Sequence, residues 1–89
     1  MFLIGKIIEK RRFRKGMKVL RELSYLRTEE KRLSEEDRSL WLNLPMLSPE
    51  LQRKSRPRRI KVAYDFLEVR RRIRKCTIRA RELGVTNLP

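Results

Sequence analysis

The sequence predicts an all-α fold of two long helices joined by a proline-rich corner, an extended helical hairpin with a basic N-terminal arm. Three observations predict it. Apolar residues recur at helical spacing in two separate stretches, prolines cluster between these stretches, and neither Gly nor Pro interrupts residues 17–43. An antiparallel hairpin would bury the two apolar stripes against each other. The alternative is two separate arms that lie on an external surface.

Residues 1–18 form the basic arm, with seven Lys or Arg residues and one acid, Glu9. Apolar residues also gather near its start. A basic, acid-poor and amphipathic profile is typical of a mitochondrial targeting segment. A basic arm that docks on RNA is the alternative, and an uncleaved segment could serve both purposes. The candidate RNA-binding residues of the arm are Arg11, Arg12, Arg14, Lys15 and Lys18.

The first helix is predicted over residues 17–43. Its apolar stripe repeats every seven residues with one intervening member, which is helical spacing. Glu30 and Asp37 interrupt the stripe, so the seam is not that of a strong coiled coil. Ser34 opens an acidic run that could restart the helix as a capping box, so the sequence allows a bend near this residue. The stripe consists of Val19, Leu23, Leu26, Leu33 and Leu40.

Residues 44–48 form the predicted corner. Pro45 ends the first helix, because the residue before a proline is disfavoured in the helical conformation. Ser48 can cap the next helix, and Pro49 suits the first helical position. Glu50 then interacts favourably with the positive end of the helix dipole.

Pro57 breaks the pattern once more, so separate helices are predicted over 49–56 and 58–83, followed by a tail at 84–89. The longer of these helices has seven apolar residues at alternating spacings of four and three. At roughly 1.5 Å per residue it is on the order of 40 Å long. Gly84 ends it, as glycine commonly does just past a helix. The stripe consists of Val62, Phe66, Val69, Ile73, Cys76, Ala80 and Leu83, and Ile60, Ala63, Tyr64 and Leu67 widen it.

Net charge is the strongest indication of function. The 89 residues carry 25 Lys+Arg, 11 Asp+Glu and no His, for a formal charge of +14. Residues 1–18 contribute +6, residues 19–50 contribute −2 and residues 51–89 contribute +10. Self-repulsion of this size opposes compaction in a short chain with little core material, so an anionic partner is expected to complete the fold. Nucleic acid, an anionic membrane surface and an acidic protein are the candidates.

Two further basic clusters follow the arm, and arginine outnumbers lysine in both. The guanidinium fork fits phosphate in a bidentate way and stacks on bases. In a basic-region zipper the basic stretch and the apolar heptads are separate halves, whereas here the basic residues share their helix with the apolar stripe, which argues against a DNA-reading dimer. The low aromatic content argues against a platform that stacks the bases of single-stranded nucleic acid. The pattern favours helices that fill grooves between RNA segments while one face packs on protein. The candidate RNA-binding residues are Arg53, Lys54, Arg56, Arg58, Arg59, Lys61, Arg70, Arg71, Arg72, Arg74, Lys75, Arg79 and Arg81.

No catalytic, metal or cofactor site is predicted. The chain has no His to act as a base, and its one cysteine, Cys76, is expected to be a small packing residue. Its three glycines are isolated, so no phosphate-cradling loop is present. No apolar run approaches the roughly 20 residues that span a bilayer. We therefore expect no small-molecule substrate and no stable membrane insertion.

The most distinctive string runs from Leu40 to Glu50 and places Trp41 just before the proline corner. A tryptophan flanked by leucines must bury its ring against something. One interpretation is that Trp41 closes the small core of the hairpin. The other is that it anchors in a pocket on a neighbouring protein or on RNA. The candidate protein-packing residues are Leu40, Trp41, Leu42, Leu44, Pro45, Phe66 and Ile73.

This string resembles the Trp-Leu-x-x-Pro-x-Met-Thr/Ser-x-Glu signature of the mitochondrial ribosomal protein 63 family, a component of the large mitoribosomal subunit. The Met1-Phe2-Leu3 start and the Arg11-Arg12 pair are also similar to that family, as is the order of a mixed-charge helix, the Trp and a basic helix. The resemblance implies a structural protein of the mitochondrial matrix, with rRNA and neighbouring ribosomal proteins as partners and no enzymatic activity.

Two other functions fit the same composition. Accessory or assembly subunits of inner-membrane respiratory complexes are also small, helical and basic, and their positive charge interacts with anionic lipid. A small-subunit ribosomal protein could share the same layout. Co-sedimentation with ribosomal subunits and flotation with liposomes are the observations that separate these alternatives.

Overall fold

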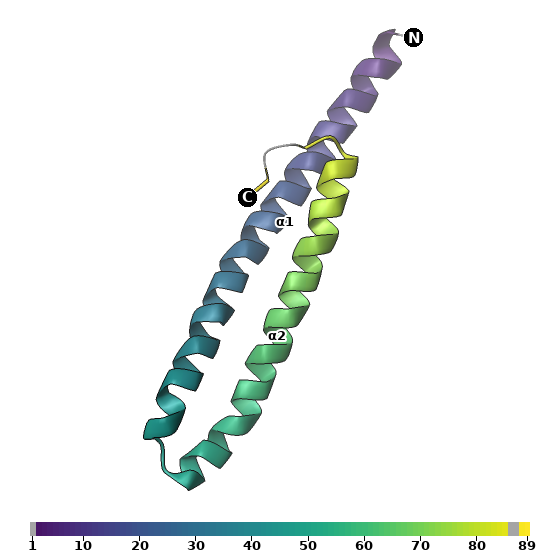
Figure 1. Cartoon of the computed structure of the whole chain (residues 1–89). Coiled ribbons are helices and arrows are strands. Elements are labelled where there is room, and N and C mark those ends of the chain that lie inside the picture. The colour runs from purple at the N-terminus through teal and green to yellow at the C-terminus, as the bar shows by residue number, and fades with distance from the viewer. Residues whose placement is uncertain (1, 86–87) are drawn as a thin grey trace.

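In a computed structural model the chain forms two helices that lie side by side and run in opposite directions (Figure 1). The structure describes residues 2–85 and 88–89, and of residues 2–9 it describes the backbone alone. Helix α1 spans Phe2–Asn43, the 3-10 helix η1 spans Leu44–Met46, and helix α2 spans Pro49–Glu82. The predicted all-α hairpin is confirmed, and the alternative of two separate arms is wrong.

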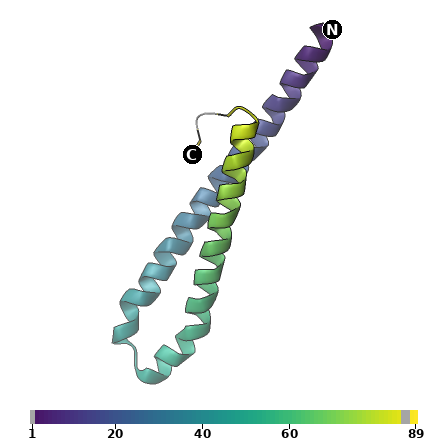
Figure 2. The same cartoon turned by 45° about the vertical axis from the view of Figure 1, so that its right-hand side comes forward.

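The hairpin is a thin rod. Its extents are 71 × 18 × 14 Å, and its radius of gyration is 19.7 Å, whereas a compact domain of this length would have about 12 Å. The turn lies at one end of the rod, and at the other end α1 projects beyond the end of α2 in both views (Figures 1 and 2). A rod of this shape leaves most side chains on its surface.

Helix α1 begins at Phe2 rather than near residue 17, so the predicted arm is the first part of the same helix. Gly16 does not interrupt it, although glycine costs about 1 kcal/mol relative to Ala within a helix. The helix also continues through Ser34, where the sequence allowed a bend. Arg32 lies one turn from both Glu29 and Glu36 and pairs with them at 2.9 and 3.4 Å, which supports a continuous helix across this region.

The core lies in the half of the rod that contains the end of α2. There the predicted stripes of the two helices meet, and the buried thiol of Cys76 fills the packing role expected of it. Leu33 and Val62 are buried outside this cluster, nearer the turn. The cluster consists of Val19, Leu23, Leu26, Ile73, Cys76 and Ala80, with Val69, Leu83, Val85 and Leu88 packed against it.

Towards the turn the seam becomes polar. Glu30 and Asp37 are half-buried at the stripe positions that they were predicted to interrupt, and Ser55 and Arg59 are half-buried on α2. Polar side chains at the seam contribute less to stability than apolar burial does. The main apolar cluster therefore lies in one half of the hairpin, and Leu33 and Val62 are the buried apolar residues nearer the turn.

The corner follows the predicted signals and adds one contact. The Ser48 hydroxyl accepts a hydrogen bond from Leu51 N at 3.3 Å and caps α2, with Pro49 in the first turn. The Gln52 side-chain amide donates to Leu44 O at 3.0 Å and to Leu47 O at 3.1 Å. Gln52 therefore holds η1 against the start of α2, a role that the sequence pattern did not reveal.

The predicted break at Pro57 is wrong, because α2 is one helix from Pro49 to Glu82. A proline removes one helical hydrogen bond and crowds the preceding turn, which bends a helix without necessarily ending it. The ribbon of α2 changes direction in its first turns (Figures 1 and 2). The Gln52 carbonyl in this turn accepts from Ser55 Oγ at 2.8 Å and from Arg59 Nη2 at 3.2 Å. These two side-chain hydrogen bonds stabilise the part of α2 around Pro57.

Gly84 ends α2 as predicted, with a φ of +80° that favours glycine. Val85 N donates to Ala80 O, and Gly84 N donates to Arg81 O, both at 3.0 Å, which is the Schellman pattern. Leu88 packs against the core cluster, and Arg27 Nε of α1 donates to Pro89 O at 3.2 Å. The sequence predicted the stop but not the return of the tail.

Replacing Gly16 with Leu should cost about 1 to 3 kcal/mol through overpacking and regain about 1 kcal/mol of helix propensity, so we expect the free energy of unfolding to fall by up to about 2 kcal/mol. A Cβ atom at Gly16 would lie 3.2 Å from Val85 Cγ2, so a larger side chain would displace the tail. Thermal unfolding followed by circular dichroism measures the effect, in buffer with sulfate, which strengthens apolar burial. Adding Val85→Ala should restore most of the loss. A double variant no more stable than the single variant would contradict this packing.

Candidate nucleic-acid interface

The predicted RNA-binding residues line the whole rod instead of forming one patch. All of them have exposed side chains except Arg59, which is half-buried. The first group lies on the projecting part of α1, the second on the first turns of α2, and the third on the second half of α2. Phosphates could therefore contact this rod at several places along its length.

The projecting part of α1 carries the bases of the arm. Arg11, Arg12, Arg14 and Lys15 are exposed, and consecutive residues of a helix are turned by about 100° from each other. These bases therefore lie within an arc of roughly 160°, on one broad side of the helix. Lys18 is also exposed, at the point where α2 begins to cover α1.

Three acids of α1 pair with arginines of α2. Glu22 lies 3.8 Å from Arg72, Glu30 lies 3.9 Å from Arg70, and Glu36 pairs with Arg58. These carboxylates face the second helix. The arginine side chains remain 52–61% exposed, so each pair adds little stability. The pairs hold three of the predicted RNA-binding residues along the edges of the hairpin.

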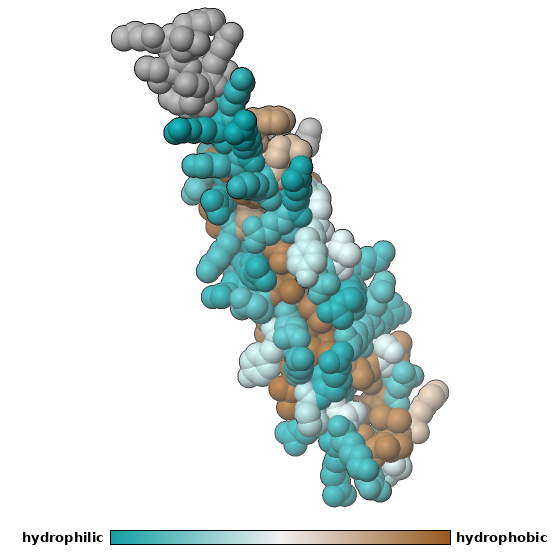
Figure 3. All heavy atoms as spheres, turned by 180° about the vertical axis from the view of Figure 1, so that it is seen from behind, coloured by the Kyte–Doolittle hydropathy of each residue, from teal (hydrophilic) through white to brown (hydrophobic). Residues whose placement is uncertain are grey.

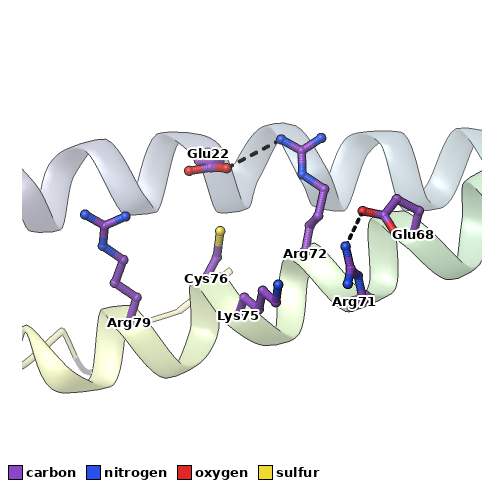
Figure 4. Close-up of a pocket in the computed structure, with 7 residues that line it drawn as sticks. All are labelled: Glu22, Glu68, Arg71, Arg72, Lys75, Cys76 and Arg79. Atoms are coloured by element: carbon purple, nitrogen blue, oxygen red, sulfur yellow. Dashed lines mark hydrogen bonds and ion pairs between the residues drawn. The ribbon is translucent and has the colours of Figure 1, made fainter.

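One groove of about 320 Å³ lies between the helices beside Cys76, and we call it the Glu22 groove (Figure 4). Arg72 and Arg79 extend towards α1 on either side of Cys76, whose sulfur points to Glu22. Arg71 donates a hydrogen bond to Glu68 at 3.0 Å. This contact is the main reason that the pKa of Glu68 lies below its usual value. The groove is lined by Glu22, Glu68, Arg71, Arg72, Lys75, Cys76 and Arg79.

A second groove of about 350 Å³ contains a different set of charges, and we call it the Glu30 groove. It has four arginines and a single carboxylate. Arg27 comes from α1 and was not among the predicted binding residues, because it lies in the near-neutral block of the sequence. The groove is lined by Arg27, Glu30, Arg70, Ile73, Arg74, Thr77, Ile78 and Arg81.

Cys76 is held as a neutral thiol. Burial raises its pKa, and the nearby Glu22 carboxylate raises it further. The thiolate is the nucleophile in alkylation, so a raised pKa leaves less of the reactive form at any given pH. The structure therefore makes Cys76 a packing residue rather than a reactive one.

In sulfate buffer, which strengthens the apolar burial that closes the hairpin, we expect iodoacetamide to alkylate Cys76 more slowly than a free cysteine peptide at neutral pH, with its pH dependence displaced to higher pH. Urea should remove both differences, because the unfolded chain exposes the thiol and separates it from Glu22. Mass spectrometry of the alkylated fraction over time measures the rate. A folded protein that reacts as fast as the peptide would contradict the burial of Cys76.

The Arg59 side chain makes its contacts within the protein. Its guanidinium lies over the ring of Trp41, 5.2 Å from the ring centre, and its Nε donates to Ser55 Oγ at 3.3 Å. Trp41 is 55% exposed, so it does not close the core as one interpretation had it. Lys54 pairs with Glu50 on the exposed side of the same helix at 3.5 Å.

The predicted protein-packing residues divide between the seam and the surface. Ile73 is buried in the core, Phe66 is half-buried, and Leu40 and Leu44 are half-buried near the turn. Leu42 and Pro45 are exposed. Seen from behind, apolar surface follows the line between the helices and gathers again at the turn end (Figure 3).

The residues predicted to widen the second stripe do not enter the core. Ile60, Tyr64 and Leu67 are 47%, 67% and 62% exposed, and Ala63 is also exposed. They lie at helical spacing about half a turn away from the stripe that meets α1. α2 is therefore apolar on an outer face near the turn as well as along its seam.

The chain matches no protein-family model, no curated protein and no solved structure. The resemblance carried by the Trp41 string therefore stays a prediction. Within the described residues, no helix combines the length and the apolar character needed to cross a bilayer. In the same part of the chain, no group of His, Cys, Asp and Glu side chains is arranged to hold a metal ion.

Proposed function

We propose that this protein is a structural constituent of the large subunit of the mitochondrial ribosome, where it binds rRNA and packs on neighbouring ribosomal proteins. The observation that carries the proposal is a thin rod with exposed Lys and Arg side chains along its length and a small apolar core in one half. The role is structural rather than catalytic.

The shape and charge support RNA as the partner. A rod 18 × 14 Å in cross-section can lie between RNA segments and present bases to phosphates on several sides. Each phosphate that is neutralised releases condensed counterions, so many such contacts together yield strong, salt-dependent binding. The ordered arginines at the hairpin edges add bidentate contacts to phosphate.

The apolar surface supports additional contacts with protein. Trp41, Leu42 and Met46 are 55%, 64% and 86% exposed at the turn end. Exposed aromatic and apolar side chains that cluster together are typical of interaction sites. This favours the interpretation in which Trp41 anchors in a pocket of a neighbour.

The mitochondrial, large-subunit part of the proposal is supported by the sequence around Trp41 and by the basic amphipathic start of the chain. Sedimentation of tagged protein from mitochondria, with and without nuclease, tests it. We expect the protein to travel with the large subunit and to leave that fraction after nuclease treatment. Travel with the small subunit, or flotation with liposomes in the absence of RNA, would contradict the proposal and support an alternative.

Isolated protein should gain helicity when an rRNA fragment is added at physiological salt. Without a polyanion, repulsion among the excess positive charges opposes closure of a hairpin that has a small core. Circular dichroism at 222 nm follows the change, and an uncharged polymer of similar size serves as the control. A chain that is fully helical alone and unaffected by RNA would count against an RNA-completed fold.

A further inference from the structure

We infer that the Glu30 groove is a composite phosphate site, built from both helices, that receives a phosphodiester group of RNA. The inference rests on the proposed function, because it assigns part of the RNA contact to one defined place on the rod. It adds two α1 residues, Arg27 and Glu30, that charge clustering in the sequence did not suggest.

The charge balance of the groove carries the inference. The groove contains the guanidinium groups of Arg27, Arg70, Arg74 and Arg81, and Glu30 is the one carboxylate among its lining residues. Four guanidinium groups and one carboxylate therefore leave the groove with a net charge of +3. Arg74 and Arg81 pair with no carboxylate among the described side chains. Their donors are available to an anion.

Glu30 occupies the place of an internal counterion. Its Oε1 lies 3.1 Å from Arg27 Nη1, and its Oε2 lies 3.9 Å from Arg70 Nε, so one carboxylate faces one arginine of each helix. The Glu30 side chain is 25% exposed, whereas those of Arg27 and Arg70 are 46% and 61% exposed. Arg27 also donates through Nε to Pro89 O at 3.2 Å, so its remaining Nη donors are the ones it offers to a phosphate. Arg70 can keep Glu30 on one side and donate to a phosphate on the other.

The Glu22 groove offers a useful contrast. It contains two carboxylates, and each of them pairs with an arginine, Glu22 with Arg72 and Glu68 with Arg71. Its positive residues all belong to α2, so its cations are present whether or not the hairpin is closed. The Glu30 groove has a larger excess of positive charge and gains Arg27 from α1 only when the helices pack together. A phosphate bound there would also stabilise the closed hairpin, by linkage.

The apolar residues that line the groove favour a nucleotide over a free ion. Ile73 and Ile78 line it beside the arginines, and Ile78 is 51% exposed. A ribose or a base edge can pack against this apolar surface while the phosphate contacts the guanidinium groups. Inorganic phosphate makes only the polar contacts, so it should compete weakly with RNA.

The test compares variants with equal changes in charge. Arg74→Gln with Arg81→Gln removes two groove arginines that hold no ion pair to α1, and Lys31→Gln with Arg38→Gln removes two exposed bases from α1 as the matched control. Binding of a labelled rRNA fragment is measured at several salt concentrations. We expect the groove pair to weaken binding about tenfold more than the control pair, since lost charge-assisted hydrogen bonds are worth that much.

Two single variants test the composite character of the site. Arg27→Gln should weaken binding several-fold, although Arg27 lies outside the basic clusters. Glu30→Gln should strengthen binding several-fold, because it removes the counterion that competes with phosphate. The matched control for Glu30 is Glu35→Gln, an exposed acid of α1, which should change binding less. Circular dichroism of each variant, bound to RNA, confirms that the hairpin is retained.

The outcomes separate the inference from the proposed function. If the groove pair weakens binding no more than the control pair, the groove assignment is overturned and RNA binding stands. If Glu30→Gln weakens binding with the hairpin retained, Glu30 is not a competing counterion and the assignment is also overturned. If the unaltered protein does not bind RNA, the proposed function itself fails. Binding to phosphatidylglycerol vesicles that the groove pair alone abolishes, without RNA binding, would assign the site to a lipid phosphate instead.

Discussion

Replacing Arg74, Lys75 and Arg79 together with Gln is expected to weaken binding to an rRNA fragment strongly and to flatten its dependence on salt. All three side chains are exposed, and none of them pairs with a carboxylate among the described residues. Each lost phosphate contact removes about 0.7 to 0.9 from the slope of log affinity against log salt, so the triple variant should lose about 2 to 3. Titrations at several salt concentrations measure the slope.

The matched control for this variant is Arg21→Gln, Lys31→Gln and Arg38→Gln in α1. It changes the net charge by the same amount, and its three side chains are also exposed. It lies in the block of the chain whose acids and bases nearly balance. If both triple variants lost the same affinity and the same slope, total charge alone would govern binding and the assigned contacts on α2 would be wrong.

Leu23→Ala should unfold most of the hairpin. Leu23 is fully buried at the centre of the cluster, between Val19 and Leu26 on α1 and the core residues of α2. Truncating a buried leucine costs about 2 to 5 kcal/mol, which is comparable to the whole stability of a small domain. The loss should be large here because the cluster contains few side chains that could close the cavity. Helicity and thermal unfolding, both followed by circular dichroism in sulfate buffer, measure it.

Leu42→Ala is the matched control, because it is the same substitution in the same helix at a residue that is 64% exposed. It should leave the melting temperature nearly unchanged. A similar loss of stability in both variants would contradict the difference in burial between Leu23 and Leu42, and a stable Leu23→Ala protein would contradict the observed core. Should Leu42→Ala instead release the protein from ribosomal particles, the exposed turn end would be shown to be an interface.

Much of the fold follows from local spacing. The stripe from Val62 to Leu83, the cap at Ser48 and the stop at Gly84 depend on residues within a turn or two of each other, and all three are confirmed. Two boundaries were wrong for a physical reason that they share. Gly16 and Pro57 both weaken a helix locally, but neither outweighs the packing and hydrogen bonds on either side, so each lies within a continuous helix.

The candidate interface was predictable in part. That the Lys and Arg side chains are exposed was expected from their charge, and the structure confirms it for nearly all of them. The pairing of Glu22, Glu30 and Glu36 with arginines of α2 was not expected. These partners are 22 to 50 residues apart, and helical spacing within one segment carries no information about which residue of the other helix lies opposite.

Helical periodicity and capping residues in the sequence were sufficient to establish two long helices and their corner, because these features depend on residues that are near each other in the chain. The composition alone established the strong positive charge. The register of the antiparallel pair established the rest. It placed Arg27 and Glu30 beside Arg70, Arg74 and Arg81, turned Ile60 and Leu67 away from the core, and returned the tail across Gly16. Register depends on the packing of the whole seam, which no single stretch of the chain contains.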